Sequence, residues 1–201
     1  QATTNHPLIV HGPSGCGKTA LLGYLAQQPF LPGAEVGDVS PIILPRFIGS
    51  HPESSTLRGL MTSLCRELRV HSPVTTTEKS PEGEEQTIPA PLPDTLQKLI
   101  EEFYAQLGHA TAEQPIYVFL DALDQLEATD QARECFWLRS QILPRAGEAP
   151  CHARIVASCL SPSPEFPPES DACEPFRRLQ TRGLLADEEL CALSEAAACE
   201  L

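Results

Sequence analysis

Residues 12–19 read Gly-Pro-Ser-Gly-Cys-Gly-Lys-Thr and constrain the fold more than any other part of the chain. They match the pattern G-x-x-x-x-G-K-[ST] in full, and they lie between an apolar run at residues 8–10 and leucines at helical spacing from Lys18 onward. Glycines let the backbone curl so that successive N–H groups face phosphate oxygens, and the following helix adds its N-terminal donors. The pattern therefore predicts a phosphate-binding loop between a buried strand and a helix.

The loop assigns roles to its side chains. We expect the Lys18 ammonium to reach the β- and γ-phosphates of a nucleotide, and the Thr19 hydroxyl to ligate Mg²⁺. For Cys16 two interpretations stay open: a redox-sensitive thiol at a helix N-terminus, or a filler position that tolerates small residues. The residues expected to contact the nucleotide are Gly12, Pro13, Ser14, Gly15, Cys16, Gly17, Lys18, Thr19 and Ala20.

The apolar run at residues 116–120 ends in a carboxylate, Asp121. A phosphate-binding loop needs a carboxylate at the end of a neighbouring strand for magnesium, so we assign Asp121 as the Walker B residue and, with Thr19, as a metal ligand. Asp124 follows three residues later, where it either positions the attacking water or caps the next helical turn. We therefore predict Lys18, Asp121 and Asp124 as the catalytic residues.

Some polar residues outside these motifs are further candidates. Ser158 lies near the end of the apolar run at residues 154–160, where it is either a sensor of the γ-phosphate or an ordinary strand-end serine. The sequence does not rank the candidates for an arginine finger acting in trans, which are Arg46, Arg154, Arg177 and Arg178.

Strand-like and helix-like segments alternate along the chain, which predicts an α/β domain with a mainly parallel sheet flanked by helices. We expect the phosphate-loop strand to lie beside the Ser158 strand, which in turn lies beside the Asp121 strand. The segment 42–48 carries Pro45, and because proline lacks the N–H that a ladder needs, this strand belongs at the sheet edge. The helical segments expected are 18–28, 54–68, 94–107 and 133–142, with a short segment near 176–181 and a last helix from Asp187.

Residues 71–93 differ from the rest of the expected domain, which spans 1–201. They hold five prolines and few large apolar side chains, so they predict a disordered insertion. Directly after this insertion, Asp94 and Gln97 form a capping-box-like helix start, and Gly108 is a suitable C-cap.

Composition excludes several classes of function. The 201 residues suit one domain, and a net charge of -13 makes nucleic-acid binding a poor expectation. No apolar run reaches the 18 or so residues of a membrane span. The eight cysteines form no C-x-x-C pair, which favours buried thiols in a reducing, cytoplasmic compartment. Because residue 1 is Gln and an apolar strand follows almost at once, we expect a fragment of a longer protein.

Residues 10–22 resemble the P-loop of NACHT-type signal-transduction ATPases. Later segments are similar to the NACHT and WD-repeat domain proteins, among them Phe-Leu-Asp-Ala-Leu-Asp-Gln-Leu at 119–126, which looks like their Walker B block. The other similar segments are 46–50, 54–56, 60–65 and 155–160, the last being the sensor strand. The likeness covers most of the chain outside residues 71–93.

The resemblance implies a domain that binds ATP or another NTP with magnesium, switches conformation and drives assembly of a signalling scaffold. It also implies nucleotide-dependent self-association, and protein partners that bind through regions absent here. Many such proteins carry Asp-x-x-Asp-Glu at residues 121–125, whereas in this chain the last position of the motif is Gln125. Because a glutamine cannot accept a proton, we expect hydrolysis to be slow or to rest on Asp124. A small-acceptor phosphotransferase and a purely structural nucleotide-binding module stay open as alternatives.

Overall fold

The computed structural model describes residues 6–27, 41–79, 85–144 and 151–185. Its central sheet has four parallel strands in the order β1-β6-β5-β2. The strands, in that order, are Leu8–Gly12, Ala153–Leu160, Ile116–Asp121 and Ile42–Phe47. The expected α/β class with a parallel sheet flanked by helices is confirmed, and the strand order is the one that the motifs predicted.

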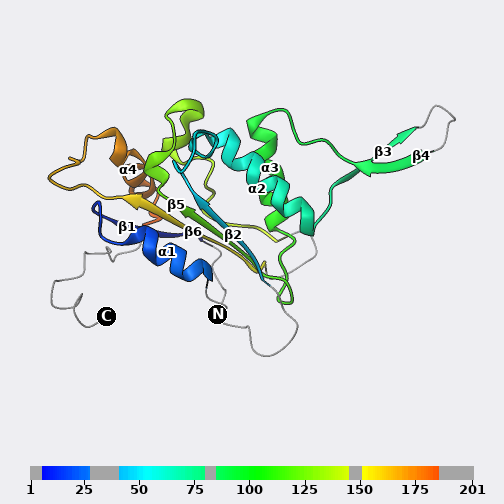
Figure 1. Ribbon diagram of the computed structural model, residues 1–201, viewed down its shortest axis with the longest axis horizontal. Helices are drawn as coiled ribbons and strands as arrows, with labels where there is room; N and C mark the ends of the chain where they lie inside the picture. Colours follow the sequence, from blue (N-terminus) through cyan, green and yellow to red (C-terminus); the bar gives the residue numbers. More distant parts are fainter. Residues whose placement is uncertain (1–5, 28–40, 80–84, 145–150, 186–201) are drawn as a thin grey trace.

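Helices cover the sheet on two sides (Figure 1). Helix α1 (Lys18–Gln27) follows the phosphate loop and lies on one face, whereas α2 (Leu57–His71) and α3 (Leu96–Leu107) pack together on the other. Helix α4 (Glu174–Thr181) packs near β6. Short 3₁₀ turns complete the described chain: η1 (Pro52–Ser55), η2 (Leu123–Gln125), η3 (Thr129–Glu134) and η4 (Asp171–Cys173). None of the helices in the described ranges combines the length and apolarity that a membrane span requires.

The main core lies between the sheet and the pair α2–α3. Both helices follow the apolar stripe expected for amphipathic helices, and the sheet side chains beneath them, such as Leu44, Val118 and Ile155, are buried. On the opposite face, α1 buries only Leu22 completely. Burial on both faces explains why the central strands read as continuous apolar runs.

Strand β2 is an edge strand among the described residues, as Pro45 predicted. The Ile42 and Ile48 N–H groups donate to the carbonyls of Pro115 and Asp121, which lie at the two ends of β5. The backbone polar groups of even-numbered β2 residues therefore point toward β5, and those of Pro45 point outward. Its missing N–H therefore removes no ladder bond. The Arg46 guanidinium donates to the outward Pro45 carbonyl at 2.8 Å.

Residues 71–93 form more regular structure than the sequence led us to expect. Helix α2 continues to His71, and β3 (Thr75–Lys79) pairs antiparallel with β4 (Glu85–Pro89) in a hairpin that projects from the body (Figure 1). The expected disorder is thus wrong for these two strands. The reason is the threonine run of β3, because β-branched residues favour extended backbone even where few apolar groups are available.

The helix expected over residues 133–142 is not present. The 3₁₀ turn η3 ends at Glu134, and Cys135 adopts a positive φ of 55° that stops helical continuation. Most of the apolar residues of this stretch are buried, but the segment that carries them is irregular rather than helical. The Trp137 indole N–H donates to the Ala132 carbonyl at 2.8 Å, and the Arg139 N–H donates to the Tyr104 hydroxyl at 2.8 Å.

Helix boundaries differ slightly from those expected. Thr95, not Asp94, caps α3, because its hydroxyl accepts from the Lys98 N–H. Gly108 is the C-cap, as predicted. The segment near residues 176–181 belongs to α4. The helix expected from Asp187 lies outside the described residues.

Candidate functional site

The predicted phosphate-binding loop, residues 12–19 and called the phosphate loop below, joins β1 to α1 and includes several exposed residues. Gly15 and Gly17 have positive φ angles of 76° and 95°, which side chains other than glycine rarely adopt. A Cβ atom placed on either glycine would meet no heavy atom within 4 Å. Ser14 is exposed as well, whereas Gly12 and Cys16 are buried. The loop therefore leaves its glycines accessible from outside, as a phosphate-binding loop requires.

Lys18 lies at the first position of α1 and turns back over the loop. Its ammonium donates to the Gly12 and Pro13 carbonyls at 2.8 and 2.7 Å, and it lies 3.7 Å from the Cys16 sulfur. Thr19 follows in the first helical turn and is exposed. Backbone acceptors thus hold the positive charge of Lys18 against the loop, and the predicted magnesium ligand Thr19 is the next residue.

Asp121 is the last residue of β5 and is only 5% exposed. The buried Ser158 hydroxyl donates to its Oδ1 at 2.6 Å and itself accepts the Ala122 N–H at 2.8 Å. Ala122 has a φ of 61°, an unfavourable conformation for a non-glycine residue, so the chain turns sharply directly after the carboxylate. Ser158 therefore fixes both the carboxylate and the turn, a role that strand position alone did not predict.

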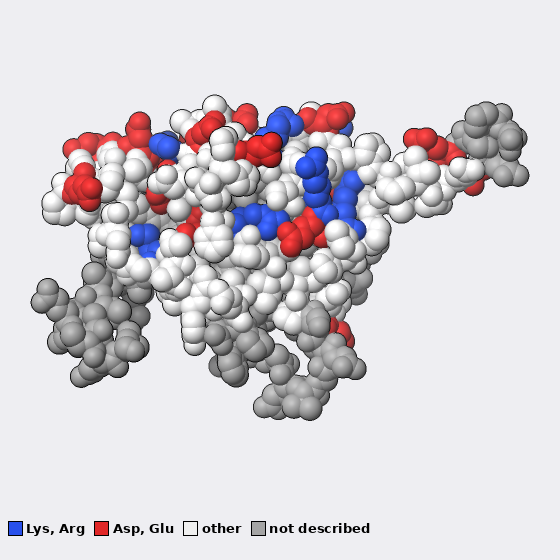
Figure 2. Space-filling view, viewed as in Figure 1, with Lys and Arg blue, Asp and Glu red and all other residues white. Residues whose placement is uncertain are grey.

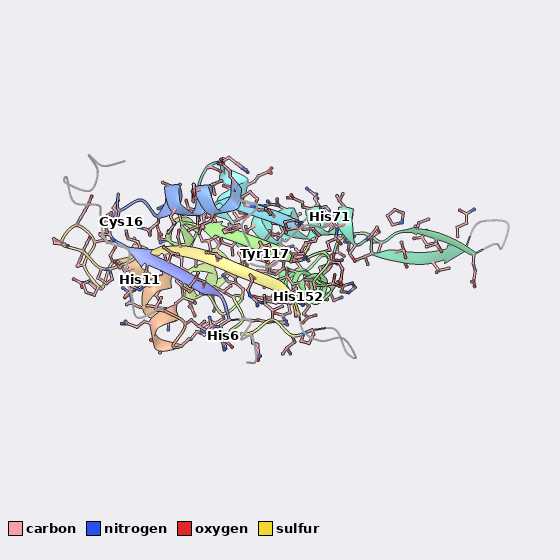
Figure 3. All side chains as sticks on the ribbon, turned by 90° about the horizontal axis from the view of Figure 1, so that it is seen from below. His6, His11, Cys16, His71, Tyr117 and His152 are labelled. Carbon is pink, nitrogen blue, oxygen red and sulfur yellow. The ribbon has the colours of Figure 1, made fainter. Side chains whose placement is uncertain are left out.

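The loop and Asp121 meet at the same edge of the sheet. Gly12 is in register with Leu160, and Leu120 is in register with Ala157, so the carboxyl ends of β1 and β5 flank the end of β6. Ligands of open parallel sheets bind outside this edge. Figure 3 shows Cys16 at this end of the molecule and His152 toward the other.

Asp124 lies inside η2 and is bonded through both oxygens. Its Oδ1 accepts the Leu160 N–H at 3.1 Å, and its Oδ2 accepts the Gln125 side-chain amide at 2.9 Å. The following 3₁₀ turn is preceded by Ala128 at its N-cap, so the expectation that Asp124 caps the next turn is wrong. Asp124 instead ties residues 121–127, which hold the predicted Walker B carboxylate and are called the Walker B segment below, to the end of β6. The residue that it contacts there, Leu160, is in register with Gly12.

The thiols of the described residues are buried, as expected for small apolar side chains. Burial raises the pKa of Cys135 to about 12. It also raises the pKa of Cys159, and the neighbouring Cys135 and Asp124 add to that second shift. Both therefore stay protonated at neutral pH and take no part in ionic chemistry at the neighbouring site.

The four candidate arginines are engaged elsewhere. Arg177 and Arg178 form ion pairs with Glu174. These contacts lower the pKa of Glu174, and the hydrogen bond from Arg177 has the larger effect. Arg46 pairs with Glu67 at 2.5 Å on the outer edge of the sheet. Arg154 lies near the start of β6 and lines a cavity of about 570 Å³ at the amino ends of the strands, away from the loop.

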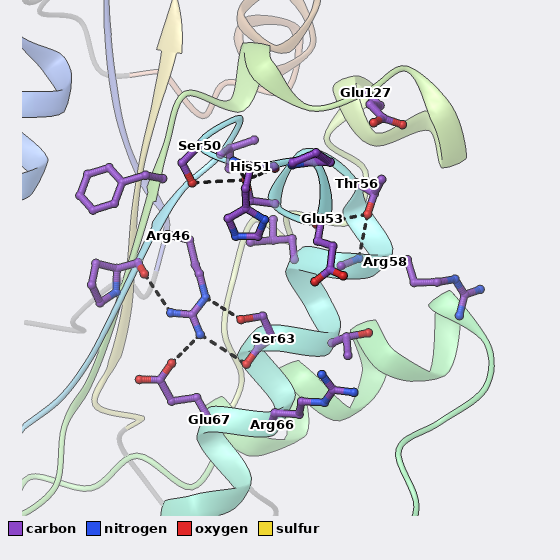
Figure 4. Close-up of a pocket in the computed structure, with 18 of the residues that line it drawn as sticks. Arg46, Ser50, His51, Glu53, Thr56, Arg58, Ser63, Arg66, Glu67 and Glu127 are labelled. Atoms are coloured by element: carbon purple, nitrogen blue, oxygen red, sulfur yellow. Dashed lines mark hydrogen bonds and ion pairs between the residues drawn. The ribbon is translucent and has the colours of Figure 1, made fainter.

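A groove of about 1210 Å³ adjoins the site along β2 and α2 (Figure 4). Arg46, Arg58 and Arg66 line it together with carboxylates, Glu127 among them. The Walker B segment lies close to the chain beside this lining. The Glu127 N–H donates to the Ser55 carbonyl at 2.8 Å, and Gly49 is so near Gln125 that an added Cβ would lie 3.0 Å from the Gln125 Cβ. The groove thus adjoins the segment that follows β5, and none of residues 12–20 lines it.

Comparisons with known proteins agree with this architecture. The family model described as "Nephrocystin 3, N-terminal" matches residues 1–159. NACHT and WD repeat domain-containing protein 2 from mouse and from human are each 30% identical over 157 residues, which is 77% of this chain. Human NACHT domain- and WD repeat-containing protein 1 is 29% identical over 142 residues, or 69% of this chain. The chain spans about 8% of the length of each of these relatives. By the match of its first 159 residues, the chain belongs to the nephrocystin 3 N-terminal family.

Proposed function

We propose that the chain binds a nucleoside triphosphate, ATP in the first instance, together with Mg²⁺, and that it acts as a slow NTPase switch within a longer signalling protein. One observation carries this proposal. The exposed loop with Lys18 and the buried carboxylate Asp121 lie at the same edge of the sheet, on the strands that flank β6.

The residues present fit a magnesium nucleotide. Gly15 and Gly17 leave open space where side chains would otherwise project, and exposed N–H groups at the start of α1 suit an anion. Lys18 supplies the charge for the outer phosphates, and Thr19 and Asp121 supply the hard oxygen ligands that Mg²⁺ prefers. The bound nucleotide would supply the phosphoanhydride bond and the metal its Lewis acidity.

The local chemistry favours slow turnover. Asp124 is held in one orientation by Leu160 and Gln125, although each carboxylate oxygen keeps a second lone pair for a water. Gln125 offers an amide where a second carboxylate would act as base. Hydrolysis therefore depends on Asp124 alone among these residues.

The contacts of the Walker B segment support a switch. This segment is bonded to β6 through Asp124 and to the rim of the groove through Glu127. A shift of this segment when the bound phosphates change would therefore alter contacts at both β6 and the groove. Such a connection is required if the nucleotide state is to control the conformation of a distant surface. The names of the relatives, with NACHT and WD repeat domains, fit a switch of this kind in a larger assembly.

The test is a comparison of ATP and GTP, with and without Mg²⁺, by calorimetry and by phosphate release. Mg²⁺-dependent binding and slow release of phosphate with no added acceptor support the proposal. Turnover only with a small acceptor would establish a phosphotransferase, and binding without turnover a structural module. Asp124→Asn keeps an oxygen for the Leu160 N–H, so it should leave binding intact and slow release. An Asp124→Asn variant with normal turnover would contradict the role given to Asp124.

A further inference from the structure

Two exposed strand edges in the described chain differ in their ability to accept another strand. At β2, Pro45 has no N–H and its carbonyl is occupied by Arg46, which Ser63 and Glu67 hold in place. Such an edge is protected against strand addition. The hairpin β3–β4 has no comparable protection along β3, whose five residues include no proline.

The register of the hairpin shows which groups face outward. The Ala90 N–H donates to the Val74 carbonyl at 2.9 Å, and this pair continues the ladder in which Thr76 faces Ile88. Because hydrogen-bonded and non-bonded pairs alternate in antiparallel strands, Thr76 and Glu78 bond to β4. The N–H and C=O groups of Thr75, Thr77 and Lys79 therefore point away from it.

The outer edge of β4 is less receptive. By the same alternation, Glu85, Thr87 and Pro89 face outward there. Pro89 has no donor, so this edge cannot form a continuous ladder. The hairpin thus has one open edge, that of β3.

The hairpin also lacks the packing that a two-stranded ribbon needs. Its described side chains are exposed or half-buried, and it projects beyond the body with acidic groups toward its outer part (Figures 1 and 2). Isolated two-stranded hairpins are marginal in water, and a third strand stabilises them. The open β3 edge is where that strand can add.

We propose that β3 pairs antiparallel with β3 of a second copy of this chain, centred on Thr77. In this register Thr77 faces Thr77, Thr76 faces Glu78, and Thr75 faces Lys79 of the other copy. No two carboxylates stand directly opposite, and a cross-strand Thr–Thr pair such as the central one is favourable. The result is a four-stranded sheet, β4-β3-β3-β4, with a closed two-fold axis.

The projection of the hairpin makes this pairing compatible with the acidic surface. Antiparallel addition places the two bodies at opposite ends of the joined ribbons, which limits repulsion between chains of net charge -13. The contact involves five residues per copy, so it lies far below the roughly 1,200 Å² of a stable interface, and we expect weak, concentration-dependent dimers.

Amide hydrogen exchange by NMR tests the pairing without nucleotide. As the protein concentration rises from about 10 μM to about 1 mM, a range suited to weak interfaces, the Thr75 and Thr77 amides should gain protection. The Thr76 and Glu78 amides, which already bond to β4, are internal references. Protection at Thr77 that does not change with concentration would overturn the proposal.

A matched pair of variants locates the contact. Thr77→Pro removes an outward donor from β3, and Thr87→Pro removes one from the directly opposite position on β4. Sedimentation velocity should show dimerisation at least tenfold weaker for Thr77→Pro and nearly unchanged for Thr87→Pro. Dimers that persist in Thr77→Pro, or a wild-type chain that stays monomeric up to about 1 mM, the upper end for a weak interface, would refute it. If both variants lose the dimer, protection of the wild-type Thr77 amide decides between β3 pairing and another contact.

Discussion

The two halves of the candidate site are built in opposite ways. The phosphate loop is largely exposed, its binding groups are mostly backbone, and Lys18 is held within the loop by two main-chain carbonyls and the Cys16 sulfur. The ends of β5 and β6 are buried, and side chains carry the arrangement, with Ser158 bonded to Asp121 and Asp124 to Leu160. Changes in the first half should therefore affect ligand binding alone, whereas changes in the second that remove a buried hydrogen bond should affect binding and folding together.

The largest effect should come from Lys18→Ala. Removing a charged donor to the phosphates should weaken triphosphate binding roughly 10- to 100-fold, as expected for hydrogen bonds to charged groups. The midpoint of urea unfolding should stay nearly unchanged, because the hydrogen bonds of the ammonium in the structure all go to groups of the loop itself. Calorimetry and urea titration check both halves of this statement, with the exposed Lys98→Ala as control. A Lys18→Ala variant that binds triphosphate normally would remove the loop from the site.

Asp121→Asn should weaken binding about tenfold, but only with Mg²⁺, since a neutral amide is a poorer ligand for a hard cation. The Asn oxygen still accepts the Ser158 hydroxyl, so the fold should survive. The measurement is nucleotide affinity with Mg²⁺ and with EDTA. Equal losses under both conditions would mean that Asp121 supports the structure rather than the metal.

Ser158→Ala should lower both the stability of the fold and the affinity for the nucleotide. It removes the donor to Asp121 and the acceptor of the Ala122 N–H in a buried place, which should lower the free energy of unfolding by about 1–3 kcal/mol. Mg²⁺-dependent binding should weaken as well, because the carboxylate loses its orientation. Urea unfolding compared with the exposed Ser50→Ala checks the first part. Stability equal to wild type would contradict the role of Ser158.

The smallest effect should follow Gln125→Glu. It adds a base, which should raise phosphate release, yet by less than about tenfold, well below the range for a well-placed base. The Gln125 side chain is directed to Asp124, so the new carboxylate would face a like charge. Single-turnover phosphate release is the measurement. A rate that does not change, combined with normal turnover in Asp124→Asn, would favour a switch reset by nucleotide exchange.

The sequence predicted the features that depend on local pattern and chain connectivity. The Gly-Lys-Thr motif located the loop, the apolar run before Asp121 located the buried carboxylate, and Pro45 placed β2 at the edge. These features follow from backbone hydrogen bonding and parallel topology, which leave few alternatives.

Features that depend on tertiary contacts could not be predicted from the sequence as well. Apolar spacing at 133–142 suggested a helix, but Trp137 is buried from an irregular segment that positive φ angles interrupt. Few apolar groups in 71–93 suggested disorder, although threonines there form β3. The position of Ser158 suggested a phosphate sensor, and only the fold shows its hydroxyl bonded to Asp121.

The strand order also has a consequence during protein synthesis. Among the described strands of the sheet, β6 is the last to emerge from the ribosome, yet it lies between β1 and β5. Until residue 160 has left the exit tunnel, β1 has no described neighbour in the sheet, and Asp121 lacks Ser158. A nascent chain halted before that point holds the complete phosphate-loop sequence but not its site. The proposed nucleotide site is thus completed only when β6 has joined the sheet, late in the synthesis of the described residues.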